Sequence, residues 1–157
     1  MKIALSANLV YLCYNVSTPA FPLAAYEKED MYKLYLADIG LLIAMYGYDM
    51  KKAIIDDTLT GAAKGGIYEN LIADMLVKRG HKLNYFRSQN GETEIEFLIT
   101  KEAQIIPVEV KANRGANVSL NRILEQTQIP YGYKLISGNV GVNDKKIVLP
   151  LYMAMFL

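Results

Sequence analysis

The spacing of apolar residues changes abruptly at Gly80, and this change constrains the fold more than any other feature. Residues 61–79 carry apolar side chains three and four positions apart, which predicts an amphipathic helix that ends at the glycine. Three strand-like runs follow, over residues 82–88, 93–100 and 104–112. The dipeptide Asn90-Gly91, between the first two runs, is a hairpin signal. This order predicts an α/β fold in which helices flank a mixed central sheet.

The rest of the chain adds shorter elements. The sequence predicts a strand over 9–16, a loop from Pro19 through the charged run 27–30, a helix over 39–45 capped by Asp38, a helix beginning at Ser119, a strand over 131–137, and a strand with a final helical turn over 145–157. Pro107 predicts either a sheet edge or an interruption in pairing. We interpret residues 1–60 as an N-terminal strand and helix appendage of the same domain, and residues 61–157 as its core.

Composition disfavours several kinds of site. The 157-residue chain has a net charge of +1, so its overall charge does not indicate a polyanionic partner. One cysteine, Cys13, and one histidine, His81, are too few for an internal disulfide or a metal site built on these residue types. The apolar run 147–157 is too short to span a bilayer. We therefore expect a cytoplasmic protein without a membrane partner.

Acidic residues recur on two of the predicted strands. Strict alternation over 93–100 would place Ile95, Phe97 and Ile99 on one face, and Glu94, Glu96 and Leu98 on the other. Glu109 and Lys111 lie two residues apart on the next strand and so face the same way, and the preceding helix can offer Glu69. A Glu-x-Lys pair alone is usually a solvated strand face. The order of the acids over three elements favours a shared site.

Several converging carboxylates repel one another, and a divalent cation with oxygen ligands, Mg²⁺ or Mn²⁺, would hold them together. A lysine beside the cation could position or deprotonate a water, or could stabilise developing negative charge. This chemistry suits the hydrolysis of a phosphodiester and needs no histidine or cysteine.

At these residues the chain resembles the PD-(D/E)XK nuclease superfamily. More narrowly, it resembles the uncharacterised C-terminal domain that follows the ATPase module in a group of bacterial and archaeal AAA+ proteins. The resemblance rests on the segments LVYLCYNVSTPAFPL, KLYLADIGLL, GGIYENLIADMLVKRG, YFRSQNGETEIEFLI and IPVEVKA, which together span most of the chain. It implies a restriction-endonuclease-like core in residues 61–157.

The resemblance also implies roles for individual residues. Glu96 and Glu109 would be metal ligands, Glu69 would contact the metal from its helix, and Lys111 would be the catalytic lysine. Glu94 would be an auxiliary acid. The family usually has aspartate where this chain has Glu96, and the longer side chain moves the carboxylate by more than an ångström. The alternative is therefore a catalytically inactive module that binds nucleic acid or protein.

The partners implied are nucleic acid, an ATPase module or further copies of the chain, and a third interpretation is a structural domain that supports oligomerisation. Cations near the acids by topology are Arg87, Lys101, Arg114 and Arg122, and the three arginines are the predicted nucleic-acid-binding residues. The stretch GAAKGG at 61–66 lacks the Gly-Lys-Ser/Thr ending of a phosphate loop. We therefore predict no ATP site in this chain and interpret the stretch as the start of the helix.

Overall fold

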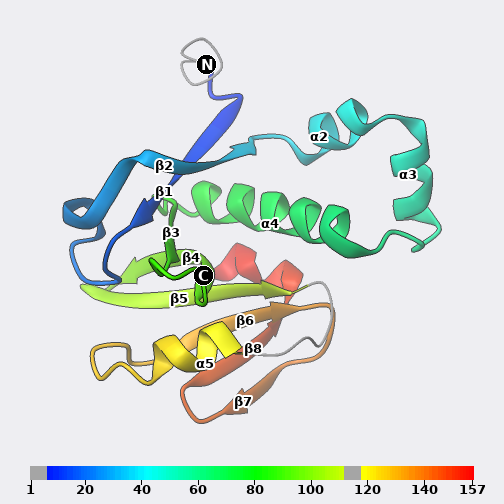
Figure 1. Ribbon diagram of the computed structural model, residues 1–157. Helices are drawn as coiled ribbons and strands as arrows, with labels where there is room; N and C mark the ends of the chain where they lie inside the picture. Colours follow the sequence, from blue (N-terminus) through cyan, green and yellow to red (C-terminus); the bar gives the residue numbers. More distant parts are fainter. Residues whose placement is uncertain (1–6, 112–117) are drawn as a thin grey trace.

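A mixed β-sheet runs through the centre of the molecule (Figure 1). The computed structural model describes residues 7–111 and 118–157, and within them the sheet has eight strands in the order β2-β1-β3-β4-β5-β6-β8-β7. They are β1 (Val10–Val16), β2 (Glu27–Leu36), β3 (Asn84–Arg87), β4 (Glu94–Lys101), β5 (Gln104–Lys111), β6 (Gly132–Ile136), β7 (Gly141–Asn143) and β8 (Lys146–Pro150). The pairs β1–β3, β5–β6 and β6–β8 are parallel, and the others are antiparallel.

Helices cover both faces of this sheet, so the predicted α/β class with a mixed sheet flanked by helices is confirmed. The helices are α2 (Ile39–Tyr46), α3 (Tyr48–Ile55), α4 (Gly61–Lys78) and α5 (Val118–Leu124), with 3₁₀ helices over Leu23–Tyr26 and Leu151–Phe156. α4 and the last 3₁₀ helix pack on one face, and α5 packs on the other. In Figure 1, α2 lies alongside the first turns of α4, and α3 lies beyond that end of the helix. No helix in the described residues is long and apolar enough to cross a membrane.

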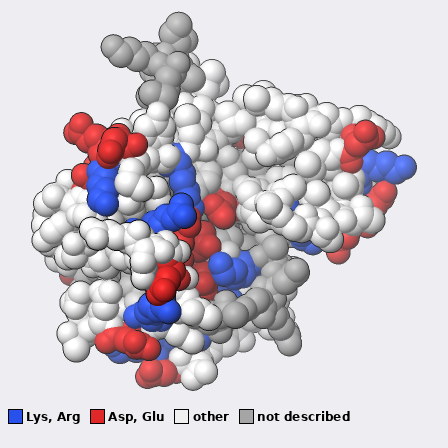
Figure 2. Space-filling view, viewed as in Figure 1, with Lys and Arg blue, Asp and Glu red and all other residues white. Residues whose placement is uncertain are grey.

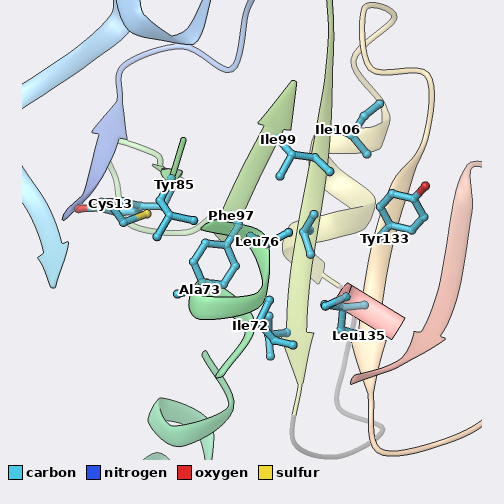
Figure 3. Close-up of a cluster of buried hydrophobic side chains, with 14 of the residues drawn as sticks. Cys13, Ile72, Ala73, Leu76, Tyr85, Phe97, Ile99, Ile106, Tyr133 and Leu135 are labelled. Carbon is cyan, nitrogen blue, oxygen red and sulfur yellow. The ribbon is translucent and has the colours of Figure 1, made fainter. Parts of the chain in front are cut away.

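The apolar face of α4 forms the larger core. Ile72, Ala73 and Leu76 are fully buried and pack against Phe97 and other sheet residues (Figure 3). Burying each large side chain of this kind contributes about 1.5–3 kcal/mol. The helix ends as predicted, and Gly80, with a φ of 90°, reverses the chain after it. The stretch GAAKGG forms the first turns of α4, as the sequence predicts.

The predicted alternation of β4 is wrong at one point, because the strand contains a bulge. Two residues of β4, Glu96 and Phe97, lie opposite the single residue Tyr85 of β3, so β4 has one extra residue at this point. Ile95 and Leu98 consequently pack in the cluster that includes α5. Phe97 and Ile99 pack in the cluster that includes α4. The bulge therefore changes which face of the sheet the side chains after it occupy.

Two other predictions also differ from the structure. The charged run 27–30, predicted as a loop, begins β2, because Glu27 and Lys28 pair with the end of β1. Residues 29–31 have no partner on β1, and α3 and β7 carry no pattern that the sequence analysis recognised. Pro107 lies in a central strand, so the edge prediction is wrong. The other prediction, an interrupted pairing, agrees with the β5–β6 ladder, which begins at Val108.

We predict that Gly132→Ala destabilises the fold. Gly132 of β6 lies so close to β5 and α5 that a Cβ would come within 2.9 Å of side-chain atoms of Pro107 and Leu120 and within 3.2 Å of the Pro107 carbonyl oxygen. Overpacking of this kind costs about 1–3 kcal/mol, which urea denaturation measures.

Gly65→Ala provides the matched control. Gly65 lies within α4, and a Cβ there would meet nothing within 4 Å. Alanine is the better helix former, so the control should gain about 0.5–1 kcal/mol. Equal losses in the two variants would contradict the close packing of β6 on β5.

Candidate functional site

Glu96, Glu109 and Lys111 meet where β4 and β5 part. The ladder between these strands ends at Phe97. Beyond it, the Val110 N–H donates to Glu96 Oε2 at 3.2 Å, so a side chain takes the place of a strand partner. Lys111 Nζ lies 3.0 Å from Glu96 Oε1 and 3.6 Å from Glu109 Oε1. The bulge and the end of pairing together bring the two carboxylates to one ammonium group.

Glu109 is the most deeply buried of the predicted site residues. Its side chain is 1% exposed, and its Oε2 atom has no hydrogen-bond partner among the described residues. Burial raises the pKa of Glu109, the charge of Lys111 lowers it, and repulsion from Glu96 raises it again, so that the pKa lies above its ordinary value. A buried polar atom without a partner costs roughly 1–3 kcal/mol. The Oε2 atom can therefore gain from a donor or a cation supplied from outside the described residues.

Lys111 is held in its charged form. Burial lowers the pKa of Lys111, but attraction and hydrogen bonds from Glu96 and Glu109 outweigh burial and leave the pKa above its ordinary value. At neutral pH this group is an ammonium, which acts as a cation and a hydrogen-bond donor rather than as a base.

A second acid–lysine group lies beside the first and is built on β2, β4 and α4. Lys33 Nζ lies 2.6 Å from Glu94 Oε1 and 3.7 Å from Glu69 Oε2. Tyr35 Oη donates to the same Glu69 oxygen at 3.2 Å. The Lys33 ammonium also lies 4.9 Å from the centre of the Tyr85 ring. One ammonium of the protein itself thus contacts both Glu69 and Glu94 and offsets one of their two charges.

Sequence reasoning missed Lys33 and Tyr35, because the sequence analysis predicts no strand over residues 31–36, which form the second half of β2. The available signal was the spacing of two between these residues in the run KLYL, the same spacing that drew attention to Glu109 and Lys111. Without a strand assignment, that spacing did not indicate a shared face.

Asn70 fixes the position of the second group. Its Oδ1 accepts the Leu36 N–H at 2.8 Å, and its Nδ2 donates to the Leu36 carbonyl at 2.9 Å, so α4 is joined to the end of β2. Glu69 is the preceding residue and is held beside Lys33. Burial raises the pKa of Glu69, Lys33 lowers it, and neighbouring glutamates raise it, leaving it above its ordinary value. Burial lowers the pKa of Lys33, but the carboxylates outweigh this and raise it.

The two groups adjoin without merging. Val110 packs on the face of α4, so by alternation Glu109 and Lys111 face away from that helix. Glu96 repels both Glu69 and Glu109, yet within the described residues no contact joins Glu69 to Glu109 or Lys111. Figure 2 shows acidic and basic atoms side by side along a hollow in the middle of one face. Of the predicted set, the structure brings Glu96, Glu109 and Lys111 together.

The donor set determines which of these residues fit a metal. Over residues 7–111 and 118–157, no three Asp, Glu, His or Cys side chains gather closely enough to hold a metal ion. Mg²⁺, however, usually uses one or two carboxylates and keeps several waters. Glu96 and Glu109, with the buried unpartnered Oε2 atom, offer such a pair of oxygen ligands. Glu69 lies outside this pair, with its Oε2 atom engaged by Lys33 and Tyr35, and its contact with a metal stays a prediction.

The predicted nucleic-acid-binding arginines differ in their surroundings. Arg87 is about half exposed, and its Nε lies 3.9 Å from Glu94 Oε2. Arg122 donates to Glu92 Oε2 at 3.2 Å and to Thr93 Oγ1 at 3.1 Å, so α5 is tied to the turn before β4. Binding of nucleic acid by either arginine stays a prediction.

Two further cations complete the predicted set. Arg114 lies outside the described residues. Lys101 lies at the hairpin end of β4, the end opposite Glu94 and Glu96, because an extended strand separates the two ends. The expectation that Lys101 lies near the acids is therefore wrong.

Comparison with known proteins gives one match. A family whose description is "Domain of unknown function (DUF4143)" matches residues 64–153, which is more than half of the chain and includes most of α4, β3 to β8 and all the predicted site residues. No curated protein and no solved structure matches the chain significantly.

We predict that Lys33→Met destabilises the protein in a pH-dependent way. The variant leaves Glu69 and Glu94 without their cation, and loss of one partner of a half-buried pair should cost about 1–3 kcal/mol at pH 7.5. The pKa of Glu69 is already raised and should rise further, so the cost should shrink as the pH falls and Glu69 takes up a proton. Urea denaturation at pH 7.5 and pH 5 measures both effects.

Lys82→Met is the matched control for this experiment. Lys82 pairs with Glu27 at 2.8 Å, but its side chain is 61% exposed. An exposed pair contributes about 0–1 kcal/mol. A loss in Lys33→Met no larger than in Lys82→Met, or one independent of pH, would show that the second acid–lysine group does not depend on Lys33.

Proposed function

The chain belongs to the family described as a domain of unknown function, DUF4143, and on that premise we propose that it is a PD-(D/E)XK nuclease-like domain with a restriction-endonuclease-like core. Its substrate would be nucleic acid, and its reaction metal-dependent hydrolysis of a phosphodiester. Glu96, Glu109 and Lys111 would form the centre of the site. Glu69 and Glu94 would act from the adjoining group, through Lys33.

One observation carries this proposal. A carboxylate oxygen of Glu109 is buried without a hydrogen-bond partner among the described residues, directly beside a second carboxylate and an ammonium that is held protonated. A strand that served only as scaffold would gain stability from an apolar residue at this position. Retaining an unsatisfied carboxylate here is typical of a site that takes up a cation or a substrate.

The chain's own residues would contribute binding and charge. Mg²⁺ or Mn²⁺, when bound, would polarise a phosphoryl oxygen and lower the pKa of a bound water. Glu96 and Glu109 would hold it. Lys111, as an ammonium, would stabilise the negative charge that develops on the phosphate rather than deprotonate the water.

A second candidate function is a binding module without catalysis. It is supported by the two lysines, because Lys33 and Lys111 already contact all four carboxylates that the sequence singles out. It is also supported by Glu96, whose side chain is longer than the aspartate that the resembled family usually has at this position. In this version the fold would hold nucleic acid or a protein, and the carboxylates would fix the lysines in place.

The sequence resemblance extends the proposal to partners. We propose that the domain works beside an ATPase module, which would supply the ATP-dependent step, since GAAKGG is helix and lacks the phosphate-loop ending. A homo-oligomeric assembly and a cytoplasmic location are part of the same proposal.

We expect Mn²⁺ or Mg²⁺ to stabilise the protein against heat. At a metal concentration of 100 times Kd, binding to the native state adds about 2.7 kcal/mol, which for a chain of this size raises Tm by about 5–10 °C. Glu109→Gln keeps the shape of the side chain but removes its charge, and should abolish the rise. Differential scanning calorimetry with and without metal measures it.

Glu102→Gln is the matched control, because Glu102 lies in the turn between β4 and β5, at the end of β5 opposite Glu109. It should retain the full metal effect. A wild type that metal does not stabilise, or an equal loss in both variants, would remove the metal site from the proposal.

We expect Lys111→Met to lower any metal-dependent plasmid nicking by about 100- to 1000-fold, the usual effect of removing one group that stabilises transition-state charge. Glu96→Asp should raise the nicking rate, because it restores the shorter arm of the resembled family. If wild type and Lys111→Met nick alike, the enzyme interpretation fails. If wild type binds nucleic acid but never cleaves it, the binding module is the correct function.

A further inference from the structure

A cavity beside the candidate site has no role in the function described so far. Its volume is about 460 Å³, and it is lined by Asn15 of β1, Lys28 and Met31 of β2, Arg87 of β3, and the turn 88–91. It lies where β2 departs from β1, because residues 29–31 have no partner on β1. A phosphate group alone would leave most of this volume empty, whereas ligand cavities of this size commonly hold a small organic molecule.

The lining of the cavity is cationic and rich in hydrogen-bond donors. Lys28 is half-buried, and within the described part of the chain no carboxylate pairs with it. Among the described residues, the only carboxylate paired with Arg87 is that of Glu94, whose Oε2 lies 3.9 Å from Arg87 Nε. No acidic residue lines the cavity. Glu29 and Asp30 belong to the unpaired stretch of β2 and are exposed.

Asn15 is a buried polar residue in the wall of the cavity. It is 1% exposed, and its Oδ1 accepts a hydrogen bond from the backbone N–H of Arg87 at 3.0 Å. Its Nδ2 has only the sulfur of Met31, at 3.8 Å, as an acceptor among the described residues. A thioether is a weak acceptor, so a buried amide donor is left largely unsatisfied at the cavity wall. An oxygen atom of a ligand would satisfy it.

The cavity also adjoins the second acid–lysine group through Arg87. Arg87 lies 3.9 Å from Glu94, and Glu94 contacts Lys33, which in turn contacts Glu69. A chain molecule bound at the second acid–lysine group could therefore place its next unit in the cavity.

We propose that this cavity binds one nucleotide unit of a nucleic-acid strand, with its phosphate between Lys28 and Arg87 and an oxygen atom on the Asn15 amide. The inference rests on the proposed function, because it names the strand of the substrate as the ligand. Two separate cations and a buried amide donor make a site for a phosphate that carries further hydrogen-bonding groups.

The test is fluorescence anisotropy with a labelled single-stranded oligonucleotide in EDTA, which prevents cleavage. Lys28→Met and Arg87→Met should each weaken binding about tenfold, as expected for loss of one charge-assisted contact. Each should also lower the slope of log K against log salt by about 0.7, the value for one phosphate contact on a single strand.

Lys101→Met is the matched control. It removes the same charge from an exposed position at the far end of β4, and it should bind within about twofold of wild type. Thermal melting of each variant separates a binding defect from a folding defect. If Lys28→Met and Arg87→Met bind no more weakly than Lys101→Met, the proposal is overturned.

A competition experiment distinguishes a nucleic-acid strand from a small phosphate ligand, and a comparison with the metal experiment separates the cavity proposal from the proposed function. Inorganic phosphate and a 5′-mononucleotide should compete at least tenfold more weakly than the oligonucleotide, since they lack the neighbouring units. Equal competition would show a small-molecule site and overturn the nucleic-acid ligand. If the wild type binds no oligonucleotide but is still stabilised by metal, only the cavity proposal is overturned. If it neither binds oligonucleotide nor is stabilised by metal, the proposed function is overturned as well.

Discussion

The hydrogen bond from the Val110 N–H to the Glu96 carboxylate is the contact on which the candidate site depends. The two strands stop pairing at this point, so the backbone of β5 would otherwise present an unpaired donor inside the protein. Glu96 supplies the missing acceptor with one oxygen and holds Lys111 with the other. A structural requirement of the sheet thus places a carboxylate at the end of β5, next to Glu109.

The bulge in β4 makes this contact geometrically available. An extra residue at Glu96-Phe97 turns Phe97 into the core beneath α4 and frees Glu96 to reach across the end of the ladder. A regular strand would have put Ile95 and Phe97 on the same face. The apolar packing and the acidic site are therefore set by one local irregularity.

Charge balance decides how the site can work. Four carboxylates in two adjoining groups share two ammonium groups, Lys33 and Lys111, each of which contacts two of them. Only Glu109, among the described residues, keeps a buried side-chain oxygen unpaired. The two ammonium groups offset two of the four carboxylate charges, so these six groups together stay net negative, and a cation entering the hollow would require the lysines and carboxylates to share their contacts with it. Glu69, held by a lysine and a tyrosine, acts in this arrangement as an anchor for Lys33.

The sequence by itself determined the class of the fold, the helix α4 and the pairing of Glu109 with Lys111, because these follow from local periodicity and from the alternation of a strand. Only the tertiary structure decided the bulge at Glu96, the strand character of the charged run in β2, and the presence of Lys33 between Glu69 and Glu94. Each of these depends on which strand lies alongside, and a partner many residues away in the chain leaves no mark on local spacing. The separation of Glu69 from Glu109 has the same origin, since it depends on which face of the finished sheet each element covers.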